Sequence, residues 1–270
     1  SIFQLMAMST LLSAKNLCIG YHSNGGNIQI HQDLNFSLRR GELISLCGPN
    51  GAGKSTLLRT IANLQPPLSG EIEVLEKPMK SYSEKELSHA ITVVLTDRAH
   101  TGGLTVKEVV ALGRQPYTGF FGRLSQEDKT LVDSAVESVG MTGKEEVYMS
   151  ELSDGERQKV MIAKSLVQEC PIVILDEPTA FLDVASRIEI TQLLHDIAHQ
   201  QDRAVLLSTH DLEQALRLSD QLWLLTKNGL QTGTPEDLVS NHQIDTLFEG
   251  RNVFFDDKTW TFRSKTGLLK

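Results

Sequence analysis

Short runs of almost wholly apolar residues recur along the chain and predict strands that are buried on both faces. Residues 42–47, 172–176 and 204–209 are the clearest of these runs, and residues 90–95 and 221–227 have the same character. Their length suits strands better than core helices. Segments with helical spacing separate several of them, and buried strands that alternate with helices indicate a doubly wound sheet. We therefore expect an α/β fold.

Three other parts of the chain follow different patterns. Residues 11–21 and 28–39 predict strands that are joined by a turn-rich segment, and residues 70–75 alternate like an edge strand. From residue 105 to about 168 the pattern is helical throughout, for example where Val160, Ala163 and Val167 recur with the period of a buried helix face. The tail, around residues 253–262, predicts a β-hairpin.

The composition limits the classes of function. The 270 residues are 40% hydrophobic and 22% charged, which suits a globular protein that buries a core. A formal net charge of −8 disfavours a broad nucleic-acid footprint, because phosphate binding needs a basic face. No apolar run approaches the length of a membrane span, and the first residues do not resemble a signal peptide. Cys18, Cys47 and Cys170 lack metal-ligand or disulfide spacing, so we expect a cytoplasmic protein.

The most specific chemistry lies between the predicted strand at 42–47 and a predicted helix at 56–63. The segment fits the phosphate-binding pattern G-x-x-x-x-G-K-[ST] and reads Gly48-Pro49-Asn50-Gly51-Ala52-Gly53-Lys54-Ser55-Thr56. Such a turn points backbone N–H groups and the positive end of a helix at one place. There Lys54 can reach the β- and γ-phosphates and Ser55 can ligate Mg²⁺. A glycine-rich loop with a chance lysine does not explain this context, so we predict a nucleoside triphosphate site.

Two further predicted strands end in polar residues. Asp176 and Glu177 end the strand at 172–176, and ligand groups of open α/β sheets gather at the carboxyl ends of strands. We expect Asp176 to hold Mg²⁺ through water and Glu177 to polarise an attacking water. His210 follows the strand at 204–209 and can bond the γ-phosphate or that water. Alone, these residues would fit an acidic strand terminus and a structural histidine. Beside a phosphate loop they predict catalysis.

A second anion site is predicted at the start of a later helix. Ser153 and Gly155 precede the helix that begins near Glu156, and such residues at a helix N-terminus can bind an anion. In isolation the segment would be an ordinary capping sequence.

Together these motifs resemble those of an ABC-transporter ATPase subunit. Residues 48–55 correspond to Walker A, residues 152–156 (LSDGE) to a variant of the signature, and residues 172–177 to Walker B. Order and spacing hold from about residue 12 to 235. The remaining correspondences are Asp183 in the D-loop, His210 as the switch histidine, and Tyr21 as the aromatic that stacks on adenine.

The resemblance implies a fold and an assembly. It implies a P-loop NTPase core at residues 8–240, with a mixed sheet, an antiparallel N-terminal β subdomain and a helical subdomain inserted at about 97–168. Residues 241–270 would be a C-terminal extension. ATP and Mg²⁺ would be the cofactors. Two copies would pair head to tail, so that Ser153 and Gly155 of one subunit close over the nucleotide of the other.

Residues 110–117 narrow the resemblance. They read Val110-Ala111-Leu112-Gly113-Arg114-Gln115-Pro116-Tyr117, similar to a helical-subdomain motif in ATPases of importers for iron–siderophore, haem or cobalamin. We call residues 113–117 the GRQPY segment. The resemblance implies that a permease docks on this subdomain at the cytoplasmic face of the membrane, with a solute-binding protein as an indirect partner.

Four alternatives are open at this point. Gly113 can be an ordinary helix end before a proline turn, and the chain can serve an exporter. It can also be a nucleotide-binding regulator without coupled transport, although residues 113–117 argue against this. An ABC ATPase that acts on nucleic acid is less well supported, because the chain has neither long coiled-coil arms nor a second ATPase half.

The chain also departs from the family pattern. A glutamine that usually follows the strand at 90–95 and touches Mg²⁺ is replaced by Thr96, followed by Asp97, and we expect the metal contact to fall to one of these. Asp154 and Glu156 add carboxylates to the signature. We expect Glu156 to turn along the helix, so that Ser153 and Gly155 keep the anion. Because Cys47 abuts Gly48, alkylation of a reachable Cys47 thiol is expected to block ATP binding.

Overall fold

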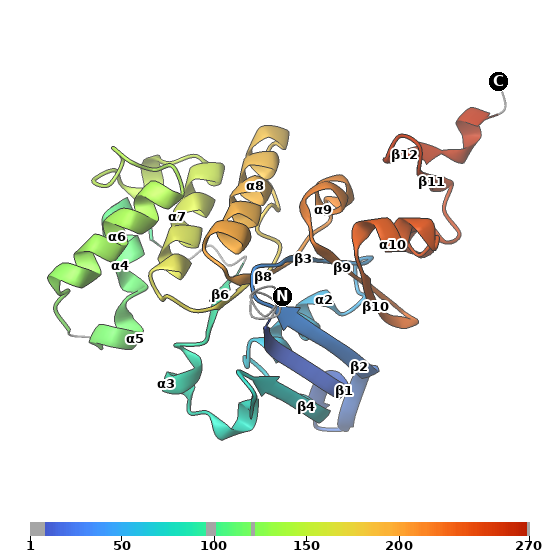
Figure 1. The fold of residues 1–270 in the computed structure, drawn as a ribbon, viewed down its shortest axis with the longest axis horizontal. Coiled ribbons are helices and arrows are strands. Elements are labelled where there is room, and N and C mark those ends of the chain that lie inside the picture. The colour runs from blue at the N-terminus through green and yellow to red at the C-terminus, as the bar shows by residue number, and fades with distance from the viewer. Residues whose placement is uncertain (1–8, 96–100, 120–121, 269–270) are drawn as a thin grey trace, which may run out of the picture.

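The apolar runs form one six-stranded sheet at the centre of the structure. The computed structural model describes residues 9–95, 101–119 and 122–268. The strands follow the order β10-β9-β3-β8-β7-β6, and neighbours are parallel except for β10 with β9 (Figure 1). They are β3 (Leu43–Cys47), β6 (Ile91–Val94), β7 (Ile172–Leu175), β8 (Ala204–Ser208), β9 (Gln221–Thr226) and β10 (Gly229–Gly233). Every residue of β3, β7 and β8 is buried, as the apolar runs predicted.

A second, antiparallel sheet is built mainly from the N-terminal part of the chain. Its order is β2-β1-β4-β5, and its strands are β1 (Thr10–Ser23), β2 (Gly26–Arg39), β4 (Ser69–Val74) and β5 (Lys77–Pro78). Helix α2 (Lys54–Ile61) contacts both β1 and the central strand β8. Leu17, Ile44 and Leu57 share one buried core, which joins this sheet to the central one. The predicted α/β class with a mixed sheet and an antiparallel N-terminal sheet is confirmed.

Helices cover the other face of the central sheet. Val173, Leu175 and Leu207 of the sheet share a core with side chains of these helices. At one side, next to β6, lies the predicted helical region, shown in green and yellow in Figure 1. Its α4, α6 and α7 each begin at a capping box, with Thr105, Ser125 or Ser153 as the N-cap. The helices of this face are α4 (Val106–Leu112), α5 (Gln115–Thr118), α6 (Gln126–Ser138), α7 (Asp154–Leu166) and α8 (Val184–Gln200).

The C-terminal part packs along β9. Cys47, Leu222 and Leu224 form a smaller core with residues of α9, α10 and the 3₁₀-helix η3. Strands β11 and β12 then pair in an antiparallel hairpin that carries Phe255 and Phe262. The elements of this part are α9 (Leu212–Leu218), α10 (Pro235–Ser240), η3 (Ile244–Phe248), β11 (Val253–Asp256), β12 (Thr261–Ser264) and η4 (Lys265–Leu268). The other short helices are α3 (Glu84–Leu87), η1 (Met79–Ser81) and η2 (Met149–Glu151).

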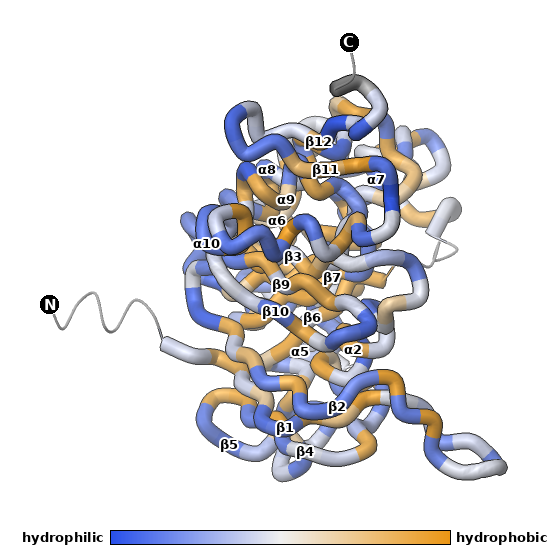
Figure 2. The backbone as a smooth tube through the Cα atoms, turned by 90° about the vertical axis from the view of Figure 1, so that its right-hand side faces the viewer, coloured by the Kyte–Doolittle hydropathy of each residue, from blue (hydrophilic) through white to orange (hydrophobic). Residues whose placement is uncertain are grey.

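The strand order brings three chain segments to one edge of the central sheet. Because β8 lies between β3 and β7, the residues that follow these parallel strands meet at their carboxyl ends. These are the phosphate loop, Asp176 with Glu177, and Thr209 with His210. Figure 2 shows hydrophobic segments concentrated where β3, β7 and β9 cross the interior. Within the described ranges, no helix combines the length and apolar character that a membrane crossing requires.

Candidate nucleotide-binding and hydrolysis site

The phosphate loop connects β3 to α2 and depends on its glycines. Gly51 (φ 80°) and Gly53 (φ 101°) have left-handed backbone conformations that favour glycine. At Gly48 a Cβ atom would lie 2.2 Å from the carbonyl oxygen of Leu225, so a side chain has no room there. The loop is therefore held close to β9 and shaped as a cradle of backbone groups.

Lys54 is the first residue of α2, and its side chain turns back into this cradle. The residue is only 7% exposed. Its Nζ atom donates to the carbonyl oxygens of Gly48 at 2.5 Å and Pro49 at 3.3 Å. Burial lowers the pKa of Lys54, while the carboxylates of Glu177 and Asp176 act in the opposite direction. The ammonium group is thus placed where the loop, Asp176 and Glu177 converge.

Two side chains from the antiparallel sheet support the loop. His31 of β2 is buried, and its Nε2 lies 2.6 Å from the carbonyl oxygen of Ala52. Tyr21 of β1 places its hydroxyl 2.5 Å from the Thr56 hydroxyl, on the first turn of α2. Tyr21 is 42% exposed, so its ring retains an accessible surface. His31 was not predictable from the sequence, because a single histidine in an alternating strand is usually structural.

Asp176 and Glu177 are held together by a serine that sequence reasoning missed. Asp176 is buried, and its Oδ1 accepts a hydrogen bond from the Ser208 hydroxyl at 3.0 Å. The same hydroxyl accepts from the backbone N–H of Glu177 at 2.8 Å. Glu177 has a left-handed backbone (φ 46°), a conformation that is uncommon for residues other than glycine. Ser208 ends an apolar run, where its hydroxyl was not distinctive.

His210 meets Glu177 directly. The distance from His210 Nε2 to Glu177 Oε1 is 2.7 Å, so a histidine and a carboxylate from neighbouring strand ends form a pair. A cavity of about 310 Å³ adjoins this pair and is lined also by Phe181 and Arg187. A second cavity of about 300 Å³ lies between the phosphate loop, His210 and residues of the C-terminal part, including Phe248.

Ser153 and Gly155 lie at the start of α7. The Ser153 hydroxyl accepts from the N–H of Glu156, and the Glu156 carboxylate accepts from the N–H of Ser153, both at 3.2 Å. The Lys144 ammonium and the Ser153 amide lower the pKa of Glu156, which is ion-paired with Lys144. Asp154 pairs with Arg157 at 2.8 Å. Glu156 therefore turns along the helix, as expected, and both added carboxylates have cationic partners.

Among the described residues, no hydrogen bond or ion pair joins the signature residues 152–156 to the phosphate loop of the same chain. A Cβ atom at Gly155 would lie 2.7 Å from the Ser186 hydroxyl, so the start of α7 packs tightly on α8. Asp183 is the N-cap of α8, and its Oδ1 accepts from the Ser186 N–H at 2.8 Å. This bond lowers the pKa of Asp183, which is exposed.

The residues present fit a nucleoside triphosphate with Mg²⁺. The glycine cradle leaves space that side chains would fill, and Lys54 directs an ammonium group into it. Ser55 offers an exposed hydroxyl and Asp176 a carboxylate, and oxygen ligands of these kinds suit Mg²⁺. The predicted metal contact at Thr96, with Asp97, lies outside the described residues.

Cys47 is expected to resist thiol reagents in the native chain. It is fully buried, and burial raises the pKa of its thiol to about 12, so almost no thiolate forms at neutral pH. The expected block of ATP binding required a reachable thiol, and this condition is not met, because Cys47 is buried in the core that also contains Ala215 and Leu222. Mass spectrometry after iodoacetamide treatment should find Cys47 unmodified, and modified once guanidinium unfolds the chain. Stoichiometric labelling of the native chain would contradict this.

The fold and the site together define a class of protein. Residues 31–180 match the ABC transporter family, and this span includes the phosphate loop, the start of α7 and the carboxylates after β7. The chain belongs to that family.

Known relatives and structures agree with this assignment. The iron(3+)-hydroxamate import ATP-binding protein FhuC of Bacillus subtilis is 37% identical over 241 residues, 87% of this chain and 88% of that protein. A transporter assigned to the metal-chelate ABC type, solved in an inward-facing conformation, matches with a TM-score of 0.77 and 27% identity over 95% of this chain and 96% of that chain. An ATP-binding cassette solved as a dimer with ADP and Pi matches with a TM-score of 0.70 and 26% identity, over 83% and 99%.

Proposed function

We propose that the chain is the ATP-hydrolysing subunit of an ABC importer for an iron–siderophore, haem or cobalamin-type solute. The observation that carries the proposal is the convergence of the Lys54 cradle, Asp176 and the Glu177–His210 pair at three adjacent strand ends. The names of FhuC and of the metal-chelate transporter support import of a metal complex. The GRQPY segment supports the same subgroup.

Each residue of the site has a distinct role in the proposed hydrolysis. Lys54 and the loop amides neutralise charge that develops on the γ-phosphoryl group. Glu177 accepts a proton from the attacking water at its carboxylate, and His210, 2.7 Å away, orients that carboxylate or bonds the γ-phosphate. Bound Mg²⁺, held by Ser55 and Asp176, would supply positive charge to the phosphate oxygens.

The signature residues act in this proposal on a second copy of the chain. Ser153 and Gly155 lie at a helix start whose backbone N–H groups favour an anion, and Asp183 lies exposed at the start of α8. The similar cassette that was solved as a dimer with ADP and Pi supports pairing of this chain. We propose a head-to-tail homodimer in which these residues complete the partner's ATP site, with Tyr21 stacked on the adenine.

The membrane partner completes the proposal. An integral-membrane permease would dock near Gly113 and Tyr117, and the subunit would be peripheral at the cytoplasmic face of the inner or plasma membrane. Both an exporter and a nucleic-acid ATPase are alternatives that the same catalytic site allows. The net charge of −8 disfavours the nucleic-acid ATPase, and the name of FhuC favours the importer over the exporter.

Purification from native membranes tests this proposal. A tagged chain is expected to bring down a permease, and the complex in liposomes should accumulate labelled ferric siderophore, haem or cobalamin only with ATP and a solute-binding protein. Transport in the opposite direction would establish an exporter. ATP hydrolysis stimulated by nucleic acid, with no permease, would overturn the proposal.

A further inference from the structure

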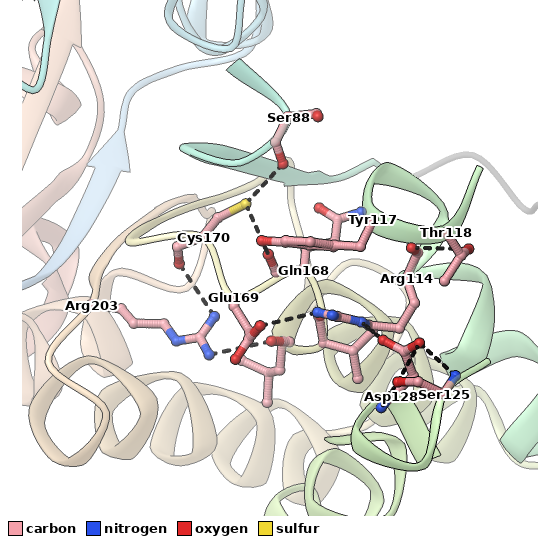
Figure 3. Close-up of polar contacts among 12 residues, drawn as sticks. Ser88, Arg114, Tyr117, Thr118, Ser125, Asp128, Gln168, Glu169, Cys170 and Arg203 are labelled. Atoms are coloured by element: carbon pink, nitrogen blue, oxygen red, sulfur yellow. Dashed lines mark hydrogen bonds and ion pairs between the residues drawn. The ribbon is translucent and has the colours of Figure 1, made fainter. Parts of the chain in front are cut away.

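The C-terminal end of α7 is held by side chains from other elements. Three consecutive carbonyl oxygens each accept a hydrogen bond from a different side chain (Figure 3). The Leu166 carbonyl accepts from Arg203 Nη2 at 3.2 Å and the Val167 carbonyl from Arg114 Nη1 at 2.8 Å. The Gln168 carbonyl accepts from the Tyr117 hydroxyl at 2.7 Å. Leu166 is the last residue of α7, Val167 is its C-cap and Gln168 follows. The last carbonyls of a helix have no partners within it and carry its negative end. We call these three side chains the α7 clamp. Two of them belong to the GRQPY segment.

Arg114 is the centre of the α7 clamp. Its side chain is 7% exposed, and Nε donates to Asp128 Oδ1 at 2.7 Å while Nη1 donates to Glu169 Oε2 at 3.0 Å. The guanidinium carbon lies 3.9 Å from the centre of the Tyr117 ring. Arg114 thus joins α6, the end of α7 and the link from α7 to β7. A planar guanidinium with several fixed donors suits such a junction, and a lysine would not replace it.

The buried partner of Arg114, Asp128, is itself held in place. The Asp128 carboxylate accepts from the Ser125 N–H at 2.8 Å and from its hydroxyl at 3.0 Å, at the start of α6. Glu169 has a left-handed backbone (φ 56°) in the turn that leads into β7. The Asp128 carboxylate therefore meets the guanidinium in a direction set by the start of α6, while the half-exposed Glu169 side chain reaches it from the turn before β7.

The GRQPY segment also touches α7 through its backbone. A Cβ atom at Gly113 would lie 2.2 Å from the carbonyl oxygen of Lys164 and 2.4 Å from Val167 Cγ2, so the segment rests directly on the last turn of α7. On its other side the Tyr117 ring meets His89, with ring centres 4.4 Å apart. The segment therefore cannot shift far without carrying the end of α7 with it.

We infer that Arg114 is a positioning residue that makes the GRQPY segment and the signature at the other end of α7 move as one body. Helix α7 has 13 residues, a length of about 20 Å, with Ser153 and Gly155 at its far end. The inference rests on the proposed function, in which the permease contacts the GRQPY segment and the signature closes on the partner's nucleotide. A displacement at the segment would reach the signature through the clamped helix.

A purely structural role for Arg114 makes a different prediction. A buried ion pair that only stabilises the fold would lower the thermal stability and affect every function of the chain equally. A positioning role instead separates two measurements. ATP binding to the monomer depends on the phosphate loop, which the α7 clamp does not touch. ATP-driven pairing of two chains depends on the position of the signature.

Arg114→Met is tested in a Glu177→Gln background, which is expected to retain ATP. Calorimetry should give a Kd for MgATP within about twofold of the value for the Glu177→Gln parent. Sedimentation should show that the dissociation constant of the dimer is raised by about tenfold or more, which corresponds to roughly 1.4 kcal/mol. Lys107→Met is the matched control, because it removes an exposed ion pair to Glu146 in the same helical region. It should change neither value. Tyr117→Phe, which removes one hydroxyl, should weaken pairing less and serves if Arg114→Met does not fold.

Equal pairing by Arg114→Met and its parent would overturn the inference, as would an equal loss of ATP binding and pairing. If the Glu177→Gln parent itself stays monomeric with MgATP, the proposed dimer is wrong. Hydrogen exchange measured without nucleotide then tests whether Arg114 positions the start of α7. Faster exchange of amides 153–157 in Arg114→Met, with amides 48–56 unchanged, would support it. Unchanged exchange at 153–157 would refute it.

Discussion

Glu177→Gln is expected to lower the rate of ATP hydrolysis by a factor of about 10²–10⁴, the usual contribution of a general base, while ATP stays bound. Glutamine keeps the shape of glutamate and can still bond His210, which lies 2.7 Å from the carboxylate. It cannot accept the proton of the attacking water. Single-turnover release of phosphate measures the loss, and equilibrium dialysis measures the retained ATP.

A matched variant separates catalysis from general damage. Glu189→Gln neutralises another glutamate, on α8, whose only ion pair among the described residues is with Lys159 at 2.9 Å. Its hydrolysis rate should equal that of the unmodified chain. If Glu177→Gln also hydrolyses ATP near the normal rate, Glu177 is not the base, and His210 becomes the residue to test.

Lys54→Met is expected to weaken ATP binding by about 10- to 100-fold. Charge-assisted hydrogen bonds of the kind that Lys54 would make to phosphate contribute about 1.5–3 kcal/mol. Methionine keeps most of the buried volume of the stem but has no donor for the β- and γ-phosphates. Calorimetric titration with MgATP gives the Kd.

The control for this variant is Lys129→Met, which removes an exposed lysine on α6. Its affinity should be unchanged, and thermal unfolding should show that both variants are folded. Undiminished affinity of Lys54→Met would mean that the cradle binds phosphate through backbone groups alone. Hydrolysis, measured at saturating ATP, would then show whether Lys54 acts only on the reacting phosphate.

The central sheet and the phosphate loop were predictable because their signals are local. A fully apolar strand such as β7 and a nine-residue loop carry their patterns within a few residues. The start of α2 was placed at Thr56 but lies at Lys54, since Gly53 serves as an N-cap without a side chain. Strand β10 was not assigned, because its sequence GLQTG has no apolar run and it pairs only at the sheet edge.

The supporting contacts of the site were not predictable in the same way. His31 and Ser208 act across sequence separations of 21 and 31–32 residues, and each has an ordinary side chain for its strand. Arg114 was noted as part of a motif, but its partners Asp128 and Glu169 lie 14 and 55 residues away. Only the packing of the elements determines which of many such residues meet.

The hydrogen bond from Ser208 breaks the symmetry of the Asp176 carboxylate. In water the two oxygens of an aspartate are equivalent and exchange by a half-turn about χ2. Here the Ser208 hydroxyl donates to one oxygen position and itself accepts the Glu177 N–H, so the two positions differ even though a half-turn exchanges the atoms that fill them. The position without the hydroxyl is the one left for a cation. An asparagine would give its single oxygen to the Ser208 hydroxyl and present an NH₂ group, a donor, at the cation position.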